Sequence, residues 1–231
     1  MRYLPLNIKT FRFIFFLACV SLTLAASAQQ LKVVDRYAAY KQAVGADSLQ
    51  GMVELKDFLP AIVYDLQYAT KENFTGKKLY KAGNKTFVRL AVARALQKVS
   101  AELLKAGYGL KIWDAYRPYA VTKKMWELIG DERYVANPAK GSGHNRGLAV
   151  DLTLTQNGND VDMGTVFDNF TDSAHHNFKN LSDSVSKNRV LLRTTMEKYG
   201  FNALETEWWH YSFPNDGRYD VLDIPFRKLG H

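Results

Sequence analysis

The stretch Gly141-Ser142-Gly143-His144-Asn145-Arg146-Gly147-Leu148-Ala149-Val150-Asp151-Leu152-Thr153-Leu154 decides how this chain folds. Side chains in a strand point to opposite faces in turn, so residues 148–154 form a strand with two unlike faces. One face is apolar and consists of Leu148, Val150, Leu152 and Leu154. The other face carries Ala149, Asp151 and Thr153. The pattern predicts a strand with one acid, directly after a glycine-rich loop that holds one histidine.

A second segment, Glu207-Trp208-Trp209-His210, supplies the matching chemistry near the C-terminus. Together with His144 and Asp151 it provides two imidazoles and two carboxylates. Catalytic zinc sites use about three ligands from His, Asp, Glu and Cys and leave a position to water. His144, Asp151 and His210 meet that requirement. Glu207 then remains as a base for a metal-activated water.

The spacing within this second segment constrains its backbone. Glu207 and His210 are three residues apart, so a regular strand would point them to opposite faces. One helical turn or a β-bulge would bring both to the same side. If both serve one metal, the backbone must bend between them. The chain has no His-Glu-x-x-His motif, so the common metalloprotease helix is excluded.

These residues resemble a known signature. Ser142-x-His144-x-x-Gly147-x-Ala149-x-Asp151 followed by Glu207-x-Trp209-His210 is similar to the motif of the D-alanyl-D-alanine dipeptidase (VanX-like) family of zinc peptidases, peptidase family M15. Further blocks match in the family's order: Tyr64-Asp65-Leu66-Gln67-Tyr68-Ala69-Thr70, Asn73-Phe74-Thr75-Gly76, Trp113-Asp114-Ala115-Tyr116-Arg117-Pro118 and Asp162-Met163-Gly164-Thr165-Val166-Phe167-Asp168. The resemblance extends from about Ile62 to the C-terminus.

The resemblance implies a role for each matching residue. It implies one zinc ion per chain, held by His144, Asp151 and His210, and a general base and acid at Glu207. Arg117 corresponds to the arginine that stabilises the oxyanion of the transition state. Ser142 and Asp168 correspond to substrate-binding residues, and Asp168 holds the free amino group of a small D,D-dipeptide. The expected reaction is hydrolysis of D-Ala-D-Ala to two D-alanines.

The remaining pattern predicts a single α+β domain with a mainly antiparallel central sheet flanked by helices. The resemblance implies that this domain is like hedgehog and D,D-peptidase domains. Strands and helices do not alternate as regular βαβ units, which argues against a parallel sheet. Helices are expected at 33–44, 88–104, 119–128 and 188–199, and strands at 52–55, 62–66, 110–113, 148–154 and 208–213. Residues 73–85, 130–146 and 156–184 are expected to be loops.

The first 28 residues have the layout of a secretory signal peptide. Arg2, Lys9 and Arg12 precede the apolar run 13–25, which ends at Ala26-Ser27-Ala28. We therefore expect cleavage before Gln29, a mature domain of residues 29–231, and a periplasmic or secreted location. The apolar run is shorter than the ~20 residues of a membrane-spanning helix, so no stable membrane insertion is expected after cleavage. An alternative is a lipid anchor at Cys19.

Composition excludes several other classes of function. Cys19 is the only cysteine, so the mature chain has no disulfide, thiol nucleophile or thiolate ligand. The leader carries three positive and no negative residues, which leaves +5 of the formal charge of +8 for the rest. Those basic residues are scattered without an aromatic-interleaved stripe, so a nucleic-acid partner is not expected.

Two alternatives to the dipeptidase interpretation share its zinc site. One is a peptidoglycan D,D-carboxypeptidase or endopeptidase, and the other is a non-catalytic, zinc-stabilised binding module. Retention of Glu207, Arg117 and Asp168 argues against the second. His175 and His176 are interpreted as loop residues, with a second metal site as the alternative. The sequence leaves the oligomeric state and the range of accepted D-amino acids open.

Overall fold

The computed structural model describes residues 31–229, and the predicted signal peptide lies outside this range. A six-stranded sheet runs through its centre in the order β3-β5-β6-β9-β8, with β7 paired to β6. The strands are β3 (Val63–Tyr64), β5 (Gly109–Asp114), β6 (Ala149–Gln156), β7 (Asn159–Asp160), β8 (Asn202–Leu204) and β9 (Glu207–Ser212). Within this sheet only the β3–β5 pair is parallel, so the predicted α+β fold with a mainly antiparallel sheet is confirmed.

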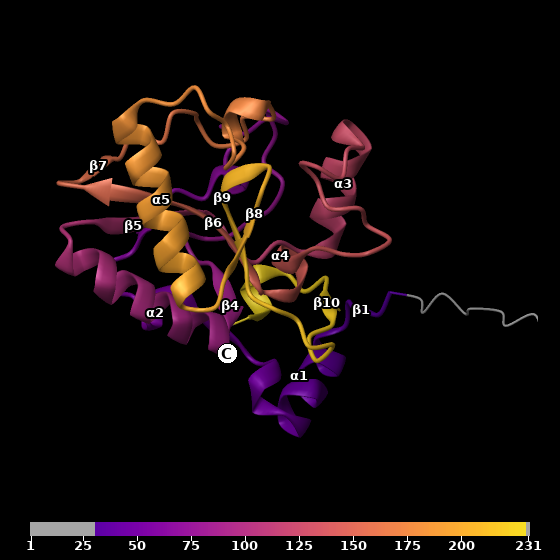
Figure 1. Cartoon of the computed structure of the whole chain (residues 1–231). Helices are drawn as coiled ribbons and strands as arrows, with labels where there is room; N and C mark the ends of the chain where they lie inside the picture. The colour runs from indigo at the N-terminus through magenta and orange to yellow at the C-terminus, as the bar shows by residue number, and fades with distance from the viewer. Residues whose placement is uncertain (1–30, 230–231) are drawn as a thin grey trace, which may run out of the picture. The chain divides into compact units, whose positions relative to one another are not determined.

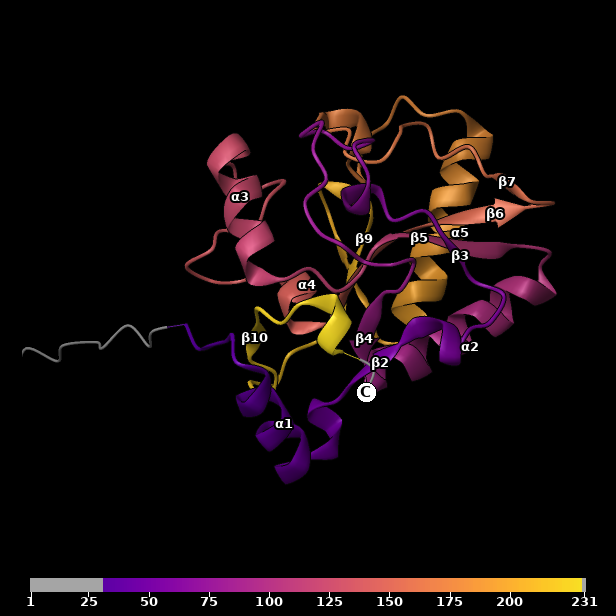
Figure 2. The same cartoon turned by 180° about the vertical axis from the view of Figure 1, so that it is seen from behind.

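Two long helices cover one face of this sheet. Helices α2 (Leu90–Lys105) and α5 (Asp183–Lys198) lie side by side in front of the strands in Figure 1 and behind them in Figure 2. Glu102 on α2 accepts hydrogen bonds from Lys198 at the end of α5 and from the following Tyr199. The opposite face is therefore free to carry the cavities described below.

Smaller elements surround the sheet. Strand β1 (Val33–Val34) pairs in parallel with β10 (Val221–Leu222), and β2 (Met52–Glu54) pairs antiparallel with β4 (Phe87–Arg89). The other α-helices are α1 (Tyr37–Ala46), α3 (Tyr119–Ile129) and α4 (Gly143–Arg146). Short 3-10 helices occur at Ser48–Gln50, Leu55–Asp57, Gln67–Ala69, Asp172–Ala174 and Phe226–Lys228. Within residues 31–229, no helix is both long and apolar enough to cross a membrane.

The central strand β6 is buried on both faces. On its apolar face, Val150, Leu152 and Leu154 join the preceding Leu148 in the hydrophobic core. Asp151 and Thr153, on the other face, line cavities. The predicted alternation therefore holds, and the polar face is enclosed by loops instead of solvent.

Several boundaries differ from the expected ones. Residues 143–146 form the short helix α4 where a loop was expected, because Ser142 and Asn145 make a capping box around its first turn. Val33 and Val34 belong to β1, Phe87–Arg89 forms β4 ahead of α2, and β8 was not foreseen. Helix α5 begins at Asp183, five residues earlier than expected, because Ser182 caps it by accepting a hydrogen bond from the Val185 N–H.

Candidate active site

Three elements bring a possible metal centre together. Helix α4 supplies His144, while Asp151 of β6 and His210 of β9 lie directly opposite each other in the sheet. One ligand atom from each residue lies within 4.8 Å of the other two. Within residues 31–229 these three side chains form the one group of potential metal ligands, and it contains no cysteine.

A bulge in β9 adds Glu207 to the group. Ala203 of β8 faces Tyr211, but the next residue, Leu204, faces Glu207, so residues 208–210 are extra on the β9 side. The Glu207 carboxylate consequently approaches His210, with 4.0 Å between Oε2 and Nδ1. The bend expected from the spacing of these two residues is present.

The imidazole of His144 is fixed with its lone pair toward the cluster. Its Nδ1 lies 2.7 Å from the carbonyl oxygen of Ala115. Because a carbonyl can only accept, Nδ1 carries the proton and Nε2 of the neutral ring carries the lone pair. Nε2 lies 3.2 Å from His210 Nδ1 and 3.3 Å from Asp151 Oδ2. A backbone carbonyl that orients a histidine in this way is typical of metal sites.

The charge states of the other two ligands also suit a cation. Burial alone would raise the pKa of Asp151, but the imidazoles of His144 and His210 hold it below its ordinary value. Burial lowers the pKa of His210, although Asp151 Oδ1 lies 2.9 Å from its Nδ1. A carboxylate and two imidazole rings form a nitrogen and oxygen donor set that fits a divalent metal such as zinc.

Arg117 lies beside this cluster in a buried network. Its Nε donates to Asp114 Oδ2 at 2.8 Å, and its Nη2 lies 3.6 Å from Asp151 Oδ2. Burial alone would lower the pKa of Arg117, but Asp114, Tyr68 and Asp151 together outweigh that effect and raise it. The guanidinium is therefore a permanent cation at the edge of the candidate metal site.

Asp114 and Tyr80 were given no role from the sequence, yet they hold this arrangement. The Tyr80 hydroxyl donates to Asp114 Oδ1 at 2.6 Å, and Asp114 Oδ2 lies 3.6 Å from His144 Nδ1. Asp114 is thus shared between the arginine and the histidine. Its place in the Trp113–Pro118 block was the available signal, whereas nothing in the sequence pointed to Tyr80, 34 residues earlier.

One carboxylate oxygen of Asp168 is hydrogen-bonded and the other is not. Oδ1 accepts a hydrogen bond from the Tyr68 hydroxyl at 2.8 Å. Oδ2 is buried and has no hydrogen-bond partner among residues 31–229. Burial raises the pKa of Asp168 to about 8, and the bond from Tyr68 only partly opposes this. Its backbone is in the left-handed region, at φ 59°.

Ser142 has a structural contact that the sequence did not reveal. As the N-cap of α4, its hydroxyl accepts a hydrogen bond from the His144 N–H at 3.2 Å. The backbone N–H of Ser142 donates to Asn145 Oδ1 at 3.0 Å. Ser142 therefore fixes the helix that carries His144, and it also borders the cavity described next.

All seven residues singled out from the sequence line one cavity of about 440 Å³. They are Arg117, Ser142, His144, Asp151, Asp168, Glu207 and His210. The Glu207 side chain is buried at its wall, and burial together with the charges of Asp151 and Asp168 raises its pKa well above the ordinary value. The volume is at the small end for ligand sites and suits a short peptide.

The two adjacent histidines do not join this cluster. His175 lies 3.8 Å from Asp172 through Nε2 and Oδ1. Burial lowers the pKa of His176 to about 4, and its ring contacts that of Tyr211. Neither belongs to a group of three potential ligands within the described part of the chain.

Comparison with known proteins places this geometry in a family. Residues 47–228 match the family model described as D-ala-D-ala dipeptidase, of peptidase family M15. The D-alanyl-D-alanine dipeptidase of Escherichia coli (strain K12) is 34% identical over 176 residues, which cover 76% of this chain and 91% of that protein. The enzyme of the same name from Enterococcus faecalis (strain ATCC 700802 / V583) is 34% identical over 183 residues, 70% of this chain and 90% of that protein.

Among solved structures, VanYB in complex with D-alanine-D-alanine aligns with 57% of this chain and 74% of its own, at 16% identity and a TM-score of 0.38. The family match spans the segments that carry all seven site residues, from Arg117 to His210. The chain belongs to the D-Ala-D-Ala dipeptidase family, peptidase family M15, as its motifs predicted.

Proposed function

We propose that this chain is a zinc-dependent dipeptidase that hydrolyses D-Ala-D-Ala to two D-alanines. The observation that carries the proposal is the position of Asp168, which borders the same small cavity as the His144, Asp151 and His210 cluster and has an unpartnered Oδ2. A free dipeptide has an ammonium group at one end, and that group can satisfy this oxygen.

His144 Nε2, His210 Nδ1 and the Asp151 carboxylate would hold one zinc ion. When bound, zinc polarises the peptide carbonyl, lowers the pKa of water and offsets the negative charges that raise the pKa of Glu207. Glu207 then takes a proton from the attacking water and passes it to the leaving amine. Its placement beside His210, through the β9 bulge, supports this role.

Arg117 is the proposed stabiliser of the oxyanion. Its guanidinium is buried, held at Nε by Asp114, and faces the cluster through Nη2. A donor fixed in advance needs no rearrangement when negative charge develops, and such a donor is worth about 10²–10³ in rate. Asp114 and Tyr80 position Arg117 without touching the substrate.

Asp168 is the proposed source of specificity for free dipeptides. Capping the amino group removes its charge and leaves the carboxylate oxygen facing an apolar cap, which costs about 1–3 kcal/mol or more. This discrimination separates a dipeptidase from the carboxypeptidase that the same zinc site would permit. Ser142 borders the cavity and contributes to substrate binding in this proposal.

The test compares free and capped substrates. We would measure hydrolysis of D-Ala-D-Ala and of N-acetyl-D-Ala-D-Ala by residues 29–231, with and without a chelator. The proposal expects zinc-dependent cleavage of the free dipeptide, much faster than cleavage of the capped one. Equal rates would favour the D,D-carboxypeptidase, and chelator-resistant cleavage would refute the zinc mechanism.

We also propose that the chain is exported and that its mature form begins at Gln29. The basic start, apolar run and Ala-Ser-Ala ending of the leader support this. Mass spectrometry of the envelope fraction tests it. An intact N-terminus would contradict the proposal, and a lipid-modified Cys19 would support the anchored alternative.

A further inference from the structure

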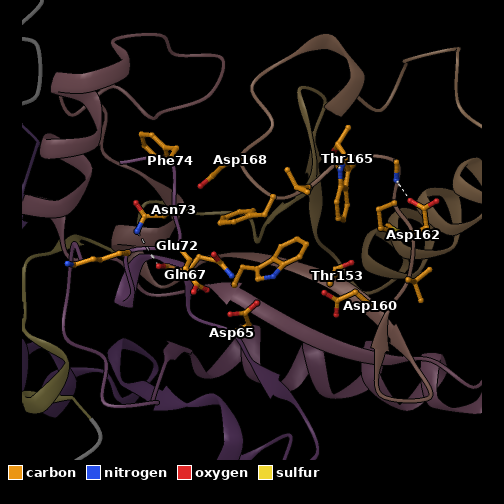
Figure 3. Close-up of a pocket in the computed structure, with 18 residues that line it drawn as sticks. Asp65, Gln67, Glu72, Asn73, Phe74, Thr153, Asp160, Asp162, Thr165 and Asp168 are labelled. Atoms are coloured by element: carbon orange, nitrogen blue, oxygen red, sulfur yellow. Dashed lines mark hydrogen bonds between the residues drawn. The ribbon is translucent and has the colours of Figure 1, made fainter. Parts of the chain in front are cut away.

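A second, larger cavity lies next to the candidate active site and has a different chemical character. It measures about 910 Å³, and Asp168 is the residue that borders both cavities. Residues 65–74 and 160–168 form its sides, and Thr153 of β6 lies on the sheet (Figure 3). Trp113 of β5 also borders it. None of the three candidate metal ligands borders it.

Its charge is opposite to that of the whole chain. Five of its lining residues are acidic and one, the exposed Lys71, is basic. The acidic residues are Asp65, Glu72, Asp160, Asp162 and Asp168. Of these, Asp160 alone has an ion-pair partner within residues 31–229, namely Lys111. A chain with a net charge of +8 thus surrounds one cavity with carboxylates.

The cavity is lined by aromatic rings as well as by acids, and the acids lie on two sides of it. Asp65 and Glu72 lie on one side and Asp160 and Asp162 on the other in Figure 3. The Trp113 and Phe167 rings border the same cavity and stack with centroids 5.0 Å apart, and Phe74 and Trp208 border it as well. This combination favours an organic cation over a metal ion. The carboxylates and the ring faces attract its charged end, and its apolar part packs against the rings.

A buried hydroxyl on the sheet also lacks a partner. Thr153 is 1% exposed and borders this cavity, and its Oγ1 makes no hydrogen bond within residues 31–229. A buried polar atom without a hydrogen bond costs free energy. A ligand with N–H donors that reaches the sheet would supply one.

We propose that this cavity is a binding site for a primary alkylammonium group on an aliphatic chain, such as the side chain of lysine or of another diamino acid. The aliphatic part lies against Trp113 and Phe167, and the ammonium group is held by Asp65 and Glu72. This site is separate from the proposed dipeptide site, and its occupation requires neither zinc nor turnover.

The tryptophans allow the site to be located directly. The chain has four, at positions 113, 126, 208 and 209. Trp113 and Trp208 border the second cavity, Trp209 borders the candidate active site, and Trp126 borders neither. Titration of the zinc-loaded mature chain with n-butylammonium chloride, followed by the indole N–H resonances in NMR, is expected to shift Trp113 saturably and leave Trp126 unchanged.

Variants establish which charges hold the cation. The double change Asp65→Asn and Glu72→Gln is expected to weaken n-butylammonium binding about tenfold or more, since it removes both charges that contact the ammonium group. Asp35→Asn is the matched control, because it removes an exposed carboxylate remote in sequence from both cavities. The Asp35→Asn variant should bind n-butylammonium with the same affinity as the parent chain.

Four outcomes would overturn the proposal. Trp113 could remain unshifted, neutral n-butanol could shift it with the same affinity, or the double variant could bind as tightly as the parent. A shift confined to Trp209 would place the cation at the active-site face of Asp168 and would equally overturn it. Since the titration needs no catalysis, its result is independent of whether D-Ala-D-Ala is the substrate.

Discussion

The Tyr80 hydroxyl lies 2.6 Å from Oδ1 of Asp114, a fully buried carboxylate. The second oxygen of Asp114 accepts from Arg117 Nε. Burial raises the pKa of Asp114 above its ordinary value even though Arg117 opposes the rise, so this carboxylate depends on its donors. Tyr80 thus supports the candidate active site from outside it.

The change Tyr80→Phe should therefore destabilise the protein. It leaves Asp114 Oδ1 buried without its donor, at a cost of about 1–3 kcal/mol in the free energy of unfolding. Urea denaturation measures this loss. Tyr199→Phe is the control, because its hydroxyl bonds the solvent-exposed Glu102 and water can replace it. Equal losses in the two variants would contradict the argument.

Metal content tests the three proposed ligands. His144→Ala and His210→Ala should each lose stoichiometric zinc, since two remaining ligands bind zinc weakly. Metal analysis of the purified proteins measures this. His176→Ala should keep its zinc because that ring lies outside the cluster. Full zinc content in either of the first two variants would remove that residue from the ligand set.

The base is tested by Glu207→Gln. The amide keeps the shape of the side chain but cannot accept a proton, so turnover of D-Ala-D-Ala should fall by a factor on the order of 10²–10⁴. Zinc content should stay the same. Steady-state kinetics together with metal analysis measure both quantities. Turnover at the parental rate would assign the base to another group.

The oxyanion role is tested by Arg117→Ala. We expect zinc to be retained and kcat to fall by a factor on the order of 10²–10³, the usual effect of losing one preorganised donor. Because Asp114 loses its partner as well, stability should fall too, and the kinetics must be measured on folded protein checked by circular dichroism. A change in KM alone would assign Arg117 to ground-state binding.

The raised pKa of Asp168 predicts a pH dependence of stability. Its pKa is about 8 in the folded chain, so between its ordinary value and 8 the folded state binds the proton that the unfolded state has lost. The free energy of unfolding of the metal-free protein should therefore decrease as pH rises through this range. Asp168→Asn should show a weaker decrease. Parallel pH profiles for the two proteins would mean that Asp168 is ordinarily acidic.

The sequence predicted the parts of the site whose chemistry is encoded locally. The alternation from Leu148 to Leu154 predicted that Asp151 lies on the face opposite the core. The three-residue spacing of Glu207 and His210 required a bend, which the β9 bulge supplies. Motif resemblance singled out Arg117, Ser142 and Asp168, and the structure has all three bordering the same cavity.

What the sequence could not predict depends on contacts between distant segments. Tyr80 contacts Asp114 across 34 residues of sequence, and Tyr68 contacts Asp168 across 100. The capping box at Ser142 and Asn145 was local, but its serine and asparagine also suit a turn, so the segment was expected to be a loop. Strand β8 is only three residues long and has no periodic signal of its own.

The direct pairing of Asp151 with His210 across β6 and β9 would give a bound metal ion a structural role in addition to its chemical one. A slip of one residue in this pairing would turn one strand's ligand to the other face of the sheet and separate the donor atoms. A tightly bound ion would therefore favour the native register over its neighbours, because it binds only the correctly paired form. Loss of the metal would then loosen strand registry as well as chemistry, and zinc supply during folding would influence how much of the chain reaches its native pairing.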